Sequence, residues 1–241
     1  MTGTTIISAF KQYYDKITNL AAPGYLDAEI LLFLNNAQDE LVKDRVFGKN
    51  FQPPAFEDNQ KQVADVQSLI VQVNKTSATV TFSTPTNYPG TNGRSLPMVD
   101  IDTRFMFFLN GEAKITRTNP TLTSRYVPLK FVRSDYLRSF LQTGFNRPWY
   151  KDVILSIVDD VFYFFPDYYS VFNSDILINY VRKPYPITAA ILEYTGSYAA
   201  TVMSLPSPVH QEIVDIAVRH ALATSQDPRY QSQLLEQQIK Q

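Results

Sequence analysis

The sequence predicts an α+β protein in which a helical layer, made by N-terminal helices and a C-terminal helix, carries a large inserted antiparallel β-domain. Three observations lead to this fold class. Apolar residues recur at helical spacing near both ends of the 241-residue chain. Between these regions, short runs alternate between apolar and polar residues, which is typical of strands. The chain also contains 15 Tyr and 16 Phe against only 8 Gly, and aromatic side chains favour strands and protein interfaces.

Two helices are predicted in an N-terminal helical part at residues 1–50. The first covers Thr4–Thr18, and the second covers Leu26–Val46 with Asp27 as its expected N-cap. The apolar stripe of the second helix contains Leu26, Ile30, Leu34, Ala37 and Leu41. Its opposite face, which is expected to be solvated, contains Asn35, Gln38, Asp39, Lys43 and Asp44.

The β-domain is predicted over residues 66–184, after a connector at residues 51–65 whose proline-containing part, Phe51–Phe56, is expected to be extended. Leu69–Val73 and Val80–Phe82 alternate between apolar and polar residues, and a turn lies between them, so they are expected to form a hairpin. The following stretch, Ser83–Pro97, is rich in Pro and Gly and is predicted to be a long loop.

Ile101–Arg117 is predicted to form two strands about Asn110-Gly111, because this dipeptide is the strongest short hairpin signal in the chain. The segment RFMFFL within it is apolar on both faces, which favours a central strand over an exposed binding patch. Further elements are expected as strands at Tyr126–Val132, Val153–Ile157, 161–165 and Asp175–Val181, and as a short helix at Ser134–Leu141. The β-domain should therefore contain roughly seven or eight strands.

The C-terminal helical part is placed at residues 185–226, and its main helix lies within Leu205–Pro228. Ser207 is the expected N-cap, and Pro208 takes the first helical position, where a missing N–H costs nothing. The buried stripe is predicted to contain Val209, Ile213, Ile216, Ala217, Ala221 and either Ala223 or Thr224. We expect this stripe to pack on the Leu26–Val46 helix and to close the helical layer around the inserted β-domain.

Charge and composition argue against several function classes. The formal net charge of -1 and the pI near 6.1 give no general attraction to nucleic acid or to anionic membranes. The absence of cysteine excludes disulfides, thiolate metal sites and cysteine nucleophiles. Met1–Leu20 lacks the basic start and the continuous apolar run of a secretory signal, and no segment approaches the roughly 20 apolar residues that span a bilayer. We therefore expect a soluble protein that does not associate with membranes.

The residue types that commonly carry catalysis do not form a recognisable site. His210 and His220 fall on different sides of one predicted helix, so a shared metal site is not expected. Asp100 with Asp102, and Asp159 with Asp160, are acid pairs, but acids at strand ends and turns are commoner than paired catalytic carboxylates. The sequence also contains no nucleophile elbow, phosphate-binding loop or dinucleotide fingerprint. We expect no catalytic residue, no cofactor and no bound metal.

Candidate interface residues lie in two stretches. Tyr88 belongs to the Pro- and Gly-rich loop, and such loops are typically either tips that contact a partner or mobile excursions. The polar tail at residues 227–241 has few apolar anchors, and it fits either a frayed terminus or a segment that a partner orders. The candidate contact residues of the tail are Arg229, Tyr230, Leu234, Leu235 and Ile239.

Three stretches together resemble the neck proteins of tailed bacteriophages: Leu26–Arg45 with LNNAQDELVKDR at its centre, Asp175–Pro186 ending in YVRKPYP, and LPSPVHQEIVDIAVRHAL near the C-terminus. The likeness is greatest to the ring proteins of crAss-like podoviruses. It spans most of the chain by the order of the elements, and it rests on structural patterns without invariant catalytic chemistry. The large β-region departs from the smallest connectors of this kind, which are mostly helical.

The resemblance implies a structural virion protein without enzyme activity. It would be a head-to-tail connector that assembles in the host cytoplasm as a ring, commonly twelvefold in this family, below the portal. Its implied partners are the portal protein, the next neck or tail ring protein, and DNA that passes through the channel without specific binding. In this chain the implied contact elements are the Leu26–Val46 and Ser207–Thr224 helices and the tail Arg229–Gln241.

The residues leave two other function classes open. The first alternative is an aromatic-rich β-domain that binds carbohydrate or a surface protein, because the excess of Tyr and Phe and the loop around Tyr88 fit a binding module. The second and less favoured alternative is a glycosidase or metal-dependent hydrolase that uses the acid pairs.

Overall fold

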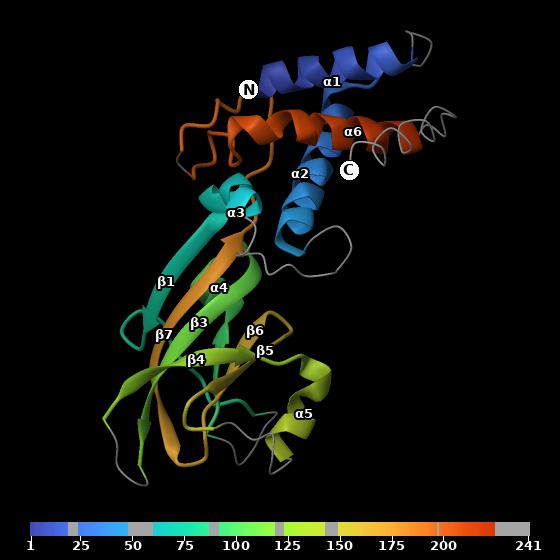
Figure 1. Ribbon diagram of the computed structural model, residues 1–241. Coiled ribbons are helices and arrows are strands. Elements are labelled where there is room, and N and C mark those ends of the chain that lie inside the picture. The colour runs from blue at the N-terminus through green and yellow to red at the C-terminus, as the bar shows by residue number, and fades with distance from the viewer. Residues whose placement is uncertain are drawn as a thin grey trace. The chain divides into compact units, whose positions relative to one another are not determined.

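The computed structural model describes residues 1–18, 24–47, 60–86, 92–118, 123–142, 149–196 and 198–224 (Figure 1). The fold is α+β, as the sequence predicts. The chain divides into two compact units. The helical unit consists of Met1–Leu69 and Lys183–Gln241, and the β unit is the continuous stretch Ile70–Arg182. The helical unit is therefore assembled from two chain segments that the whole β unit separates in sequence.

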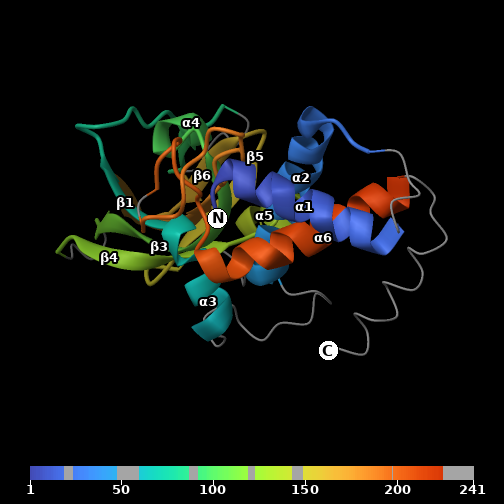
Figure 2. The ribbon, with the colours of Figure 1, turned by 90° about the horizontal axis from the view of Figure 1, so that it is seen from above.

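The helical unit is built around the last helix. Its described helices are α1 (Gly3–Thr18), α2 (Asp27–Phe47), α3 (Gln60–Val66) and α6 (His210–Thr224), with short 3₁₀ turns at Gln67–Leu69 and Ser207–Val209. The last helix, α6, packs against both α2 and α1, and Figure 2 shows it alongside α1. The prediction that the C-terminal helix packs on the second helix is therefore confirmed.

The start of α2 differs from the prediction. Asp27 is the first helical residue and not the cap, and its carboxylate pairs with Lys11 at 2.7 Å. The capping contact comes instead from Glu29, whose carboxylate accepts a hydrogen bond of 2.8 Å from the backbone N–H of Leu26. Leu26 lies before the first turn and is 72% exposed, so it does not belong to the buried stripe. The other predicted members of the stripe are buried.

The start of α6 also differs. Ser207 begins a 3₁₀ turn after Pro206 and makes no side-chain cap, and the α-helix proper starts at His210. The buried surface of the helix is wider than predicted, because it faces two neighbouring helices. Its buried residues are His210, Ile213, Val214, Ile216, Ala217, Val218, Ala221 and Leu222. Ala223 and Thr224 are exposed.

Part of the polar face of α2 is not solvated, contrary to the prediction. The Asn35 side chain accepts from the N–H of Ile187 at 2.7 Å and donates to its C=O at 3.2 Å. Gln38, which is buried, donates to the C=O of Tyr185 at 3.0 Å, and Asp39 pairs with Lys183 at 3.2 Å. Asn35 and Gln38 thus bind backbone groups of the irregular segment Lys183–Ile187, and Asp39 binds the Lys183 side chain of the same segment.

In the described residues, seven strands form one sheet of order β1-β7-β3-β4-β5-β6-β2. The strands are β1 (Ile70–Thr76), β2 (Arg94–Pro97), β3 (Phe105–Arg117), β4 (Arg125–Phe131), β5 (Val153–Val158), β6 (Val161–Phe165) and β7 (Ser170–Arg182). All neighbours are antiparallel except β4 and β5. Because the sheet curls over itself, strands from both ends of this order contribute to one hydrophobic core: Leu96 of β2 lies in it, and Val73 of β1 packs against it.

Two short helices complete the β unit. The first, α4 (Met98–Ile101), follows β2, and the second, α5 (Ser134–Gln142), agrees with the predicted short helix. A small second core joins Leu137 of α5 to Ile154 and Phe165 of the β5–β6 pair. Tyr136 of α5 is largely exposed.

The first predicted hairpin is wrong in its pairing. Val80 and Phe82 pack on the core outside any strand, and β1 pairs with β7 along its full length. Thr76 accepts backbone hydrogen bonds from Thr79 and Val80, so the chain turns immediately after β1 and does not continue as its partner. The predicted loop at Ser83–Pro97 ends in a strand, β2, that pairs with β6.

The Asn110-Gly111 dipeptide lies inside the single strand β3 and forms no hairpin turn. The register between β3 and β7 shifts between Phe108 and Asn110, which marks an irregularity in the strand. Only glycine fits at position 111, because the backbone of β7 comes very close to it. A Cβ on Gly111 would lie 2.6 Å from the backbone oxygen of Leu177. The two-residue turn is instead Asp159-Asp160 between β5 and β6, where φ is 49° and 59°.

We predict that Gly111→Ala destabilises the protein by about 1–3 kcal/mol, because the new methyl group must push apart β3 and β7. Chemical denaturation followed by circular dichroism would measure the change. Gly24→Ala is the matched control, since a Cβ there has no neighbour within 4 Å, and it should cause no loss of stability. Equal stability of the two variants would contradict the close approach at Gly111.

Candidate interaction surfaces

The predicted interface residues all fall outside the described residues. They are Tyr88 in the loop and Arg229, Tyr230, Leu234, Leu235 and Ile239 in the tail. The same holds for the predicted connector up to residue 59. These residues remain predictions, and the surfaces described below are built from other side chains.

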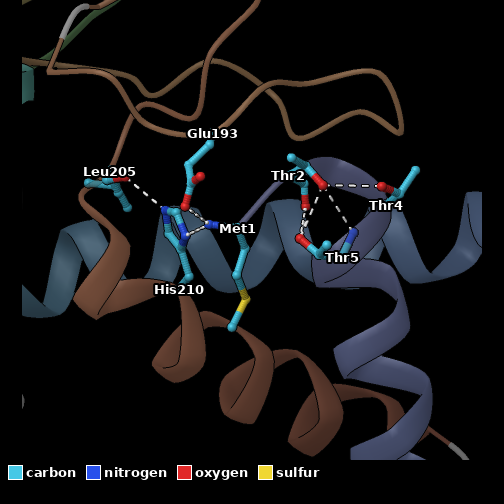
Figure 3. Close-up of polar contacts among 7 residues, drawn as sticks. All are labelled: Met1, Thr2, Thr4, Thr5, Glu193, Leu205 and His210. Atoms are coloured by element: carbon cyan, nitrogen blue, oxygen red, sulfur yellow. Dashed lines mark hydrogen bonds and ion pairs between the residues drawn. The ribbon is translucent and has the colours of Figure 1, made fainter.

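His210 fastens the start of the chain to the start of α6 (Figure 3). The Met1 ammonium group lies 3.0 Å from His210 Nδ1 and 3.2 Å from Glu193 Oε1, and His210 Nε2 lies 2.8 Å from the Leu205 C=O. An ammonium group only donates, so Nδ1 accepts and Nε2–H donates to Leu205. The ring is therefore neutral and its hydrogen bonding is complete. Burial is the main cause that lowers the pKa of His210, and the nearby ammonium charge adds to the effect.

The two histidines do not meet. His220 Nε2 lies 2.6 Å from Glu40 Oε2, in a contact between α6 and α2. Within the described ranges, no group of three or more His, Asp or Glu side chains is arranged to hold a metal ion. Each histidine thus links α6 to another part of the helical unit.

The acid pairs do not form paired sites. Asp100 lies in α4, while Asp102 follows that helix, so the stretch is not extended as a shared face requires. Asp102 accepts from Tyr180 OH at 2.7 Å and pairs with Arg182 Nε at 2.7 Å. Burial opposes ionisation of Asp102, but the backbone N–H of Arg104, Tyr180 and Arg182 together hold the pKa of Asp102 below its usual value. Burial, with this hydrogen bond, raises the pKa of Tyr180 to about 12.

The four-stranded part β1-β7-β3-β4 has a polar face turned away from the core, which we call the outer face. The strand register and the burial pattern assign to it Gln72, Asn74, Asn110, Glu112, Lys114, Thr116, Tyr126, Pro128, Lys130, Val171, Asp175, Leu177 and Asn179. Two acids and two lysines are the charged residues in this set, so their formal charges cancel.

The polar groups of the outer face bind one another. Tyr126 OH donates to Asp175 at 2.8 Å, and Lys114 Nζ lies 3.7 Å from the same carboxylate. The bond to Asp175 is the main cause that raises the pKa of Tyr126. Asn179 donates to Asn110 at 2.5 Å across the β7–β3 pair. The outer face is therefore hydrophilic, and much of its hydrogen-bonding capacity is already used within the protein.

An aromatic and cationic cluster lies at the end of the sheet where β3 ends and where β4 and β7 begin. We call it the tip cluster; its members are Arg117, Arg125, Trp149, Tyr150, Tyr168 and Tyr169. Both guanidinium groups stack near the Tyr150 ring, at 4.8 Å and 5.0 Å from its centre. Trp149 is 62% exposed and Tyr168 is 73% exposed. Exposed Trp, Tyr and Arg side chains in one place have the composition of a protein-binding hot spot.

The tip cluster was not among the surfaces predicted from the sequence. Its residues come from four chain segments that meet only through the sheet pairing, for example where the Thr118 N–H donates to the Tyr169 C=O at 2.7 Å. The adjacent aromatic pairs Trp149-Tyr150 and Tyr168-Tyr169 were the available signal, because neither pair lies in a predicted strand.

A family model described as phage tail ring protein 3/4 matches residues 1–232 of the chain, a range that takes in both units. Curated protein sequences give no significant match. Among the described helices, none has the length and apolar character needed to cross a membrane.

We predict that stability falls with acidification through His210. Its folded pKa lies below the unfolded value of about 6.5, so protonation favours the unfolded chain. The stability contribution of the neutral ring is present above about pH 6.5 and is lost as the pH falls through the folded pKa.

His210→Gln removes this titration, so its free energy of unfolding should fall less between pH 7 and pH 5 than that of the wild type. At pH 7 the variant should be about 1–3 kcal/mol less stable, because Met1 or Leu205 loses a buried partner. Urea denaturation at pH 5, 6, 7 and 8, followed by helical circular dichroism, measures both effects. Parallel pH profiles for the two proteins would contradict the assignment.

Proposed function

The chain belongs to the phage tail ring protein 3/4 family, and from this membership we propose that it is the subunit of a head-to-tail connector ring. As a member of that family it is a structural component of the virion tail. In the proposed role it bridges portal and tail and extends the DNA channel through which the genome is ejected. The family match over residues 1–232 is the observation that carries the proposal.

The outer face supports the channel part of the proposal. A wall that conducts DNA must not hold the phosphate backbone, and tight backbone binding comes from clustered Lys and Arg. The outer face balances Lys114 and Lys130 against Glu112 and Asp175, and its other residues are mostly uncharged amides and hydroxyls. Such a surface stays wetted and gives DNA no strong charge to bind.

The tip cluster supports contact with another protein of the tail or neck. Trp149 and Tyr168 present large exposed rings, and Arg117 and Arg125 add cationic groups that stack on Tyr150. We assign this surface to the portal or to the next ring, which are the protein partners of a connector. No step of this role requires catalysis, so the histidines and Asp102 act as structural residues.

The tip cluster also gives a second candidate function. Exposed aromatic rings can stack against sugar rings, so the β unit could instead be a module that binds carbohydrate or a surface protein. Specific binding on a glycan array that is lost in Trp149→Ala, from a protein that forms no ring, would favour this candidate over the connector.

We predict that the purified protein forms a ring, alone or with its portal. For a dodecamer the measured mass should be about twelve times the 27.5 kDa of the subunit. Native mass spectrometry or light scattering would give the mass, and imaging of virions would show the position of the ring. A strict monomer that forms no ring with the portal and is absent from virions would refute the proposal.

We further predict that deletion of Arg229–Gln241 leaves the subunit folded but weakens its association with the ring or portal. This segment is polar and has few apolar anchors in its sequence, so we expect it to add little to a buried core. Thermal melting of the truncated subunit tests the folding, and mass measurement with the portal tests the association. Unfolding of the truncated subunit would show that the tail belongs to the core.

A further inference from the structure

The two edges of the sheet differ. At one edge, β2 is closed: Ser95 exchanges backbone hydrogen bonds of 2.8 Å and 2.9 Å with Ser83, and Pro97 has no N–H to offer. Along an antiparallel strand, the backbone N–H and C=O groups of successive residues point alternately to the two sides. Ser95 and Pro97 are the β2 residues whose groups point away from β6. An incoming strand therefore finds no free ladder at β2.

At the other edge lies β1, beside β7 (Figure 1). Thr76 directs its C=O to the N–H groups of Thr79 and Val80, and its own N–H bonds to Thr79 Oγ1. Its backbone groups thus point away from β7. By the alternation of antiparallel pairs, Val71, Val73 and Lys75 bond to β7, while Ile70, Gln72 and Asn74 point outward.

The pairing of β7 with β3 gives the same division of β1 into residues that bond to β7 and residues that point outward. The backbone oxygen of Leu177 lies against Gly111, so Leu177 directs its backbone groups to β3. Its neighbours Ile176 and Ile178 must then direct theirs to β1, where their register partners are Lys75 and Val73.

Most of the outward groups of β1 have no partner within the described part of the chain. The Ile70 N–H closes the 3₁₀ turn Gln67–Leu69, but none of the N–H and C=O groups of Gln72 and Asn74 bonds to another described residue. The register with β7 is continuous, so no bulge interrupts the edge, and β1 contains no proline. Its one charge, Lys75, lies next to the turn. The edge from Ile70 to Asn74 thus lacks the usual features that prevent strand addition.

We propose that in the assembled ring the β1 edge of each subunit pairs with an extended segment of the neighbouring copy of this chain. The inference rests on the proposed ring function, since a ring places an identical copy beside every subunit. A cyclic ring needs a contact between two different surfaces, and an open edge meets this need because it binds any extended chain in a fixed direction. Pairing of β1 with β1 would give a closed dimer, so the donor is a different segment.

The test uses proline at an outward position. Gln72→Pro removes an outward N–H and puts a ring in the path of an incoming strand, but the β1–β7 bonds of Val71, Val73 and Lys75 remain. Gln72→Ala is the matched control, because it removes the same side chain and keeps the N–H. We expect Gln72→Pro to weaken ring assembly at least about tenfold relative to Gln72→Ala, with unchanged circular dichroism and melting of the subunit.

Hydrogen exchange of the wild type gives a second measurement that needs no variant. In the ring the amides of Gln72 and Asn74 should exchange at least about tenfold more slowly than in the dissociated subunit. The amides of Val71, Val73 and Lys75 should be protected in both states, since they bond to β7.

The outcomes separate the two proposals. A ring that forms equally well with Gln72→Pro, and whose Gln72 and Asn74 amides exchange as in the subunit, overturns the edge pairing and leaves the ring function intact. A discrete dimer in which those amides are protected would show that β1 pairs with β1 of a second copy. Protection that appears only when the portal is present would show that another protein pairs with β1. Either result overturns the inference. Failure of the wild type to form any ring overturns the proposed function itself.

Discussion

The packing of α6 on α1 and α2 is the contact on which the rest of the protein depends, because it joins the two chain segments of the helical unit. The core helices cannot close until the segment after the β unit has returned. Polar contacts then fix the helix in place: Tyr25 OH donates to the Ala221 C=O at 3.0 Å, and Arg45 pairs with both Asp65 and Glu212. The chain enters and leaves the β unit through neighbouring strands, since Ile70 is opposite Val181. An insertion with adjacent ends fits into a host fold without disturbing it.

Local signals predicted the four longest of the described helices but not α3 and α4, and the strand pairing could not be predicted from them. The spacing of apolar residues located α1, α2, α5 and α6 to within a few residues. The partner of β1, in contrast, is β7, which is distant in sequence, and the nearby Val80–Phe82 does not pair with it. The turn at Asp159-Asp160 was considered as an acid pair, although Asp tolerates the positive φ that a two-residue hairpin needs. Asn110-Gly111 was predicted as such a turn because Asn-Gly is common in hairpin turns. The actual reason for the glycine, the close approach of the Leu177 backbone, cannot be seen in the sequence.

The interaction surfaces were less predictable than the fold. The tip cluster forms only when the sheet brings four chain segments together, so its two aromatic pairs could not be recognised in the sequence as parts of one surface. The candidate residues from the loop and tail lie outside the described chain, and nothing in the fold bears on them. The sequence did predict that the histidines were not paired ligands, and His210 is indeed a buried link with both nitrogens engaged. Asn35 and Gln38 were misassigned to solvent because their partners are backbone groups of a remote irregular segment.

The β unit by itself presents three surfaces that face in different directions. The β1 edge runs along a strand, the outer face is the side of the sheet turned away from the core, and the tip cluster lies at the strand ends furthest from Ile70 and Arg182. A subunit of a tubular ring has three kinds of neighbour, namely copies beside it, another ring along the axis, and the contents of the channel. Each kind demands a different chemistry: directional backbone pairing, anchoring side chains, or a wetted surface without net charge. A single curled sheet can supply all three because its edge, end and face expose different groups of the same strands.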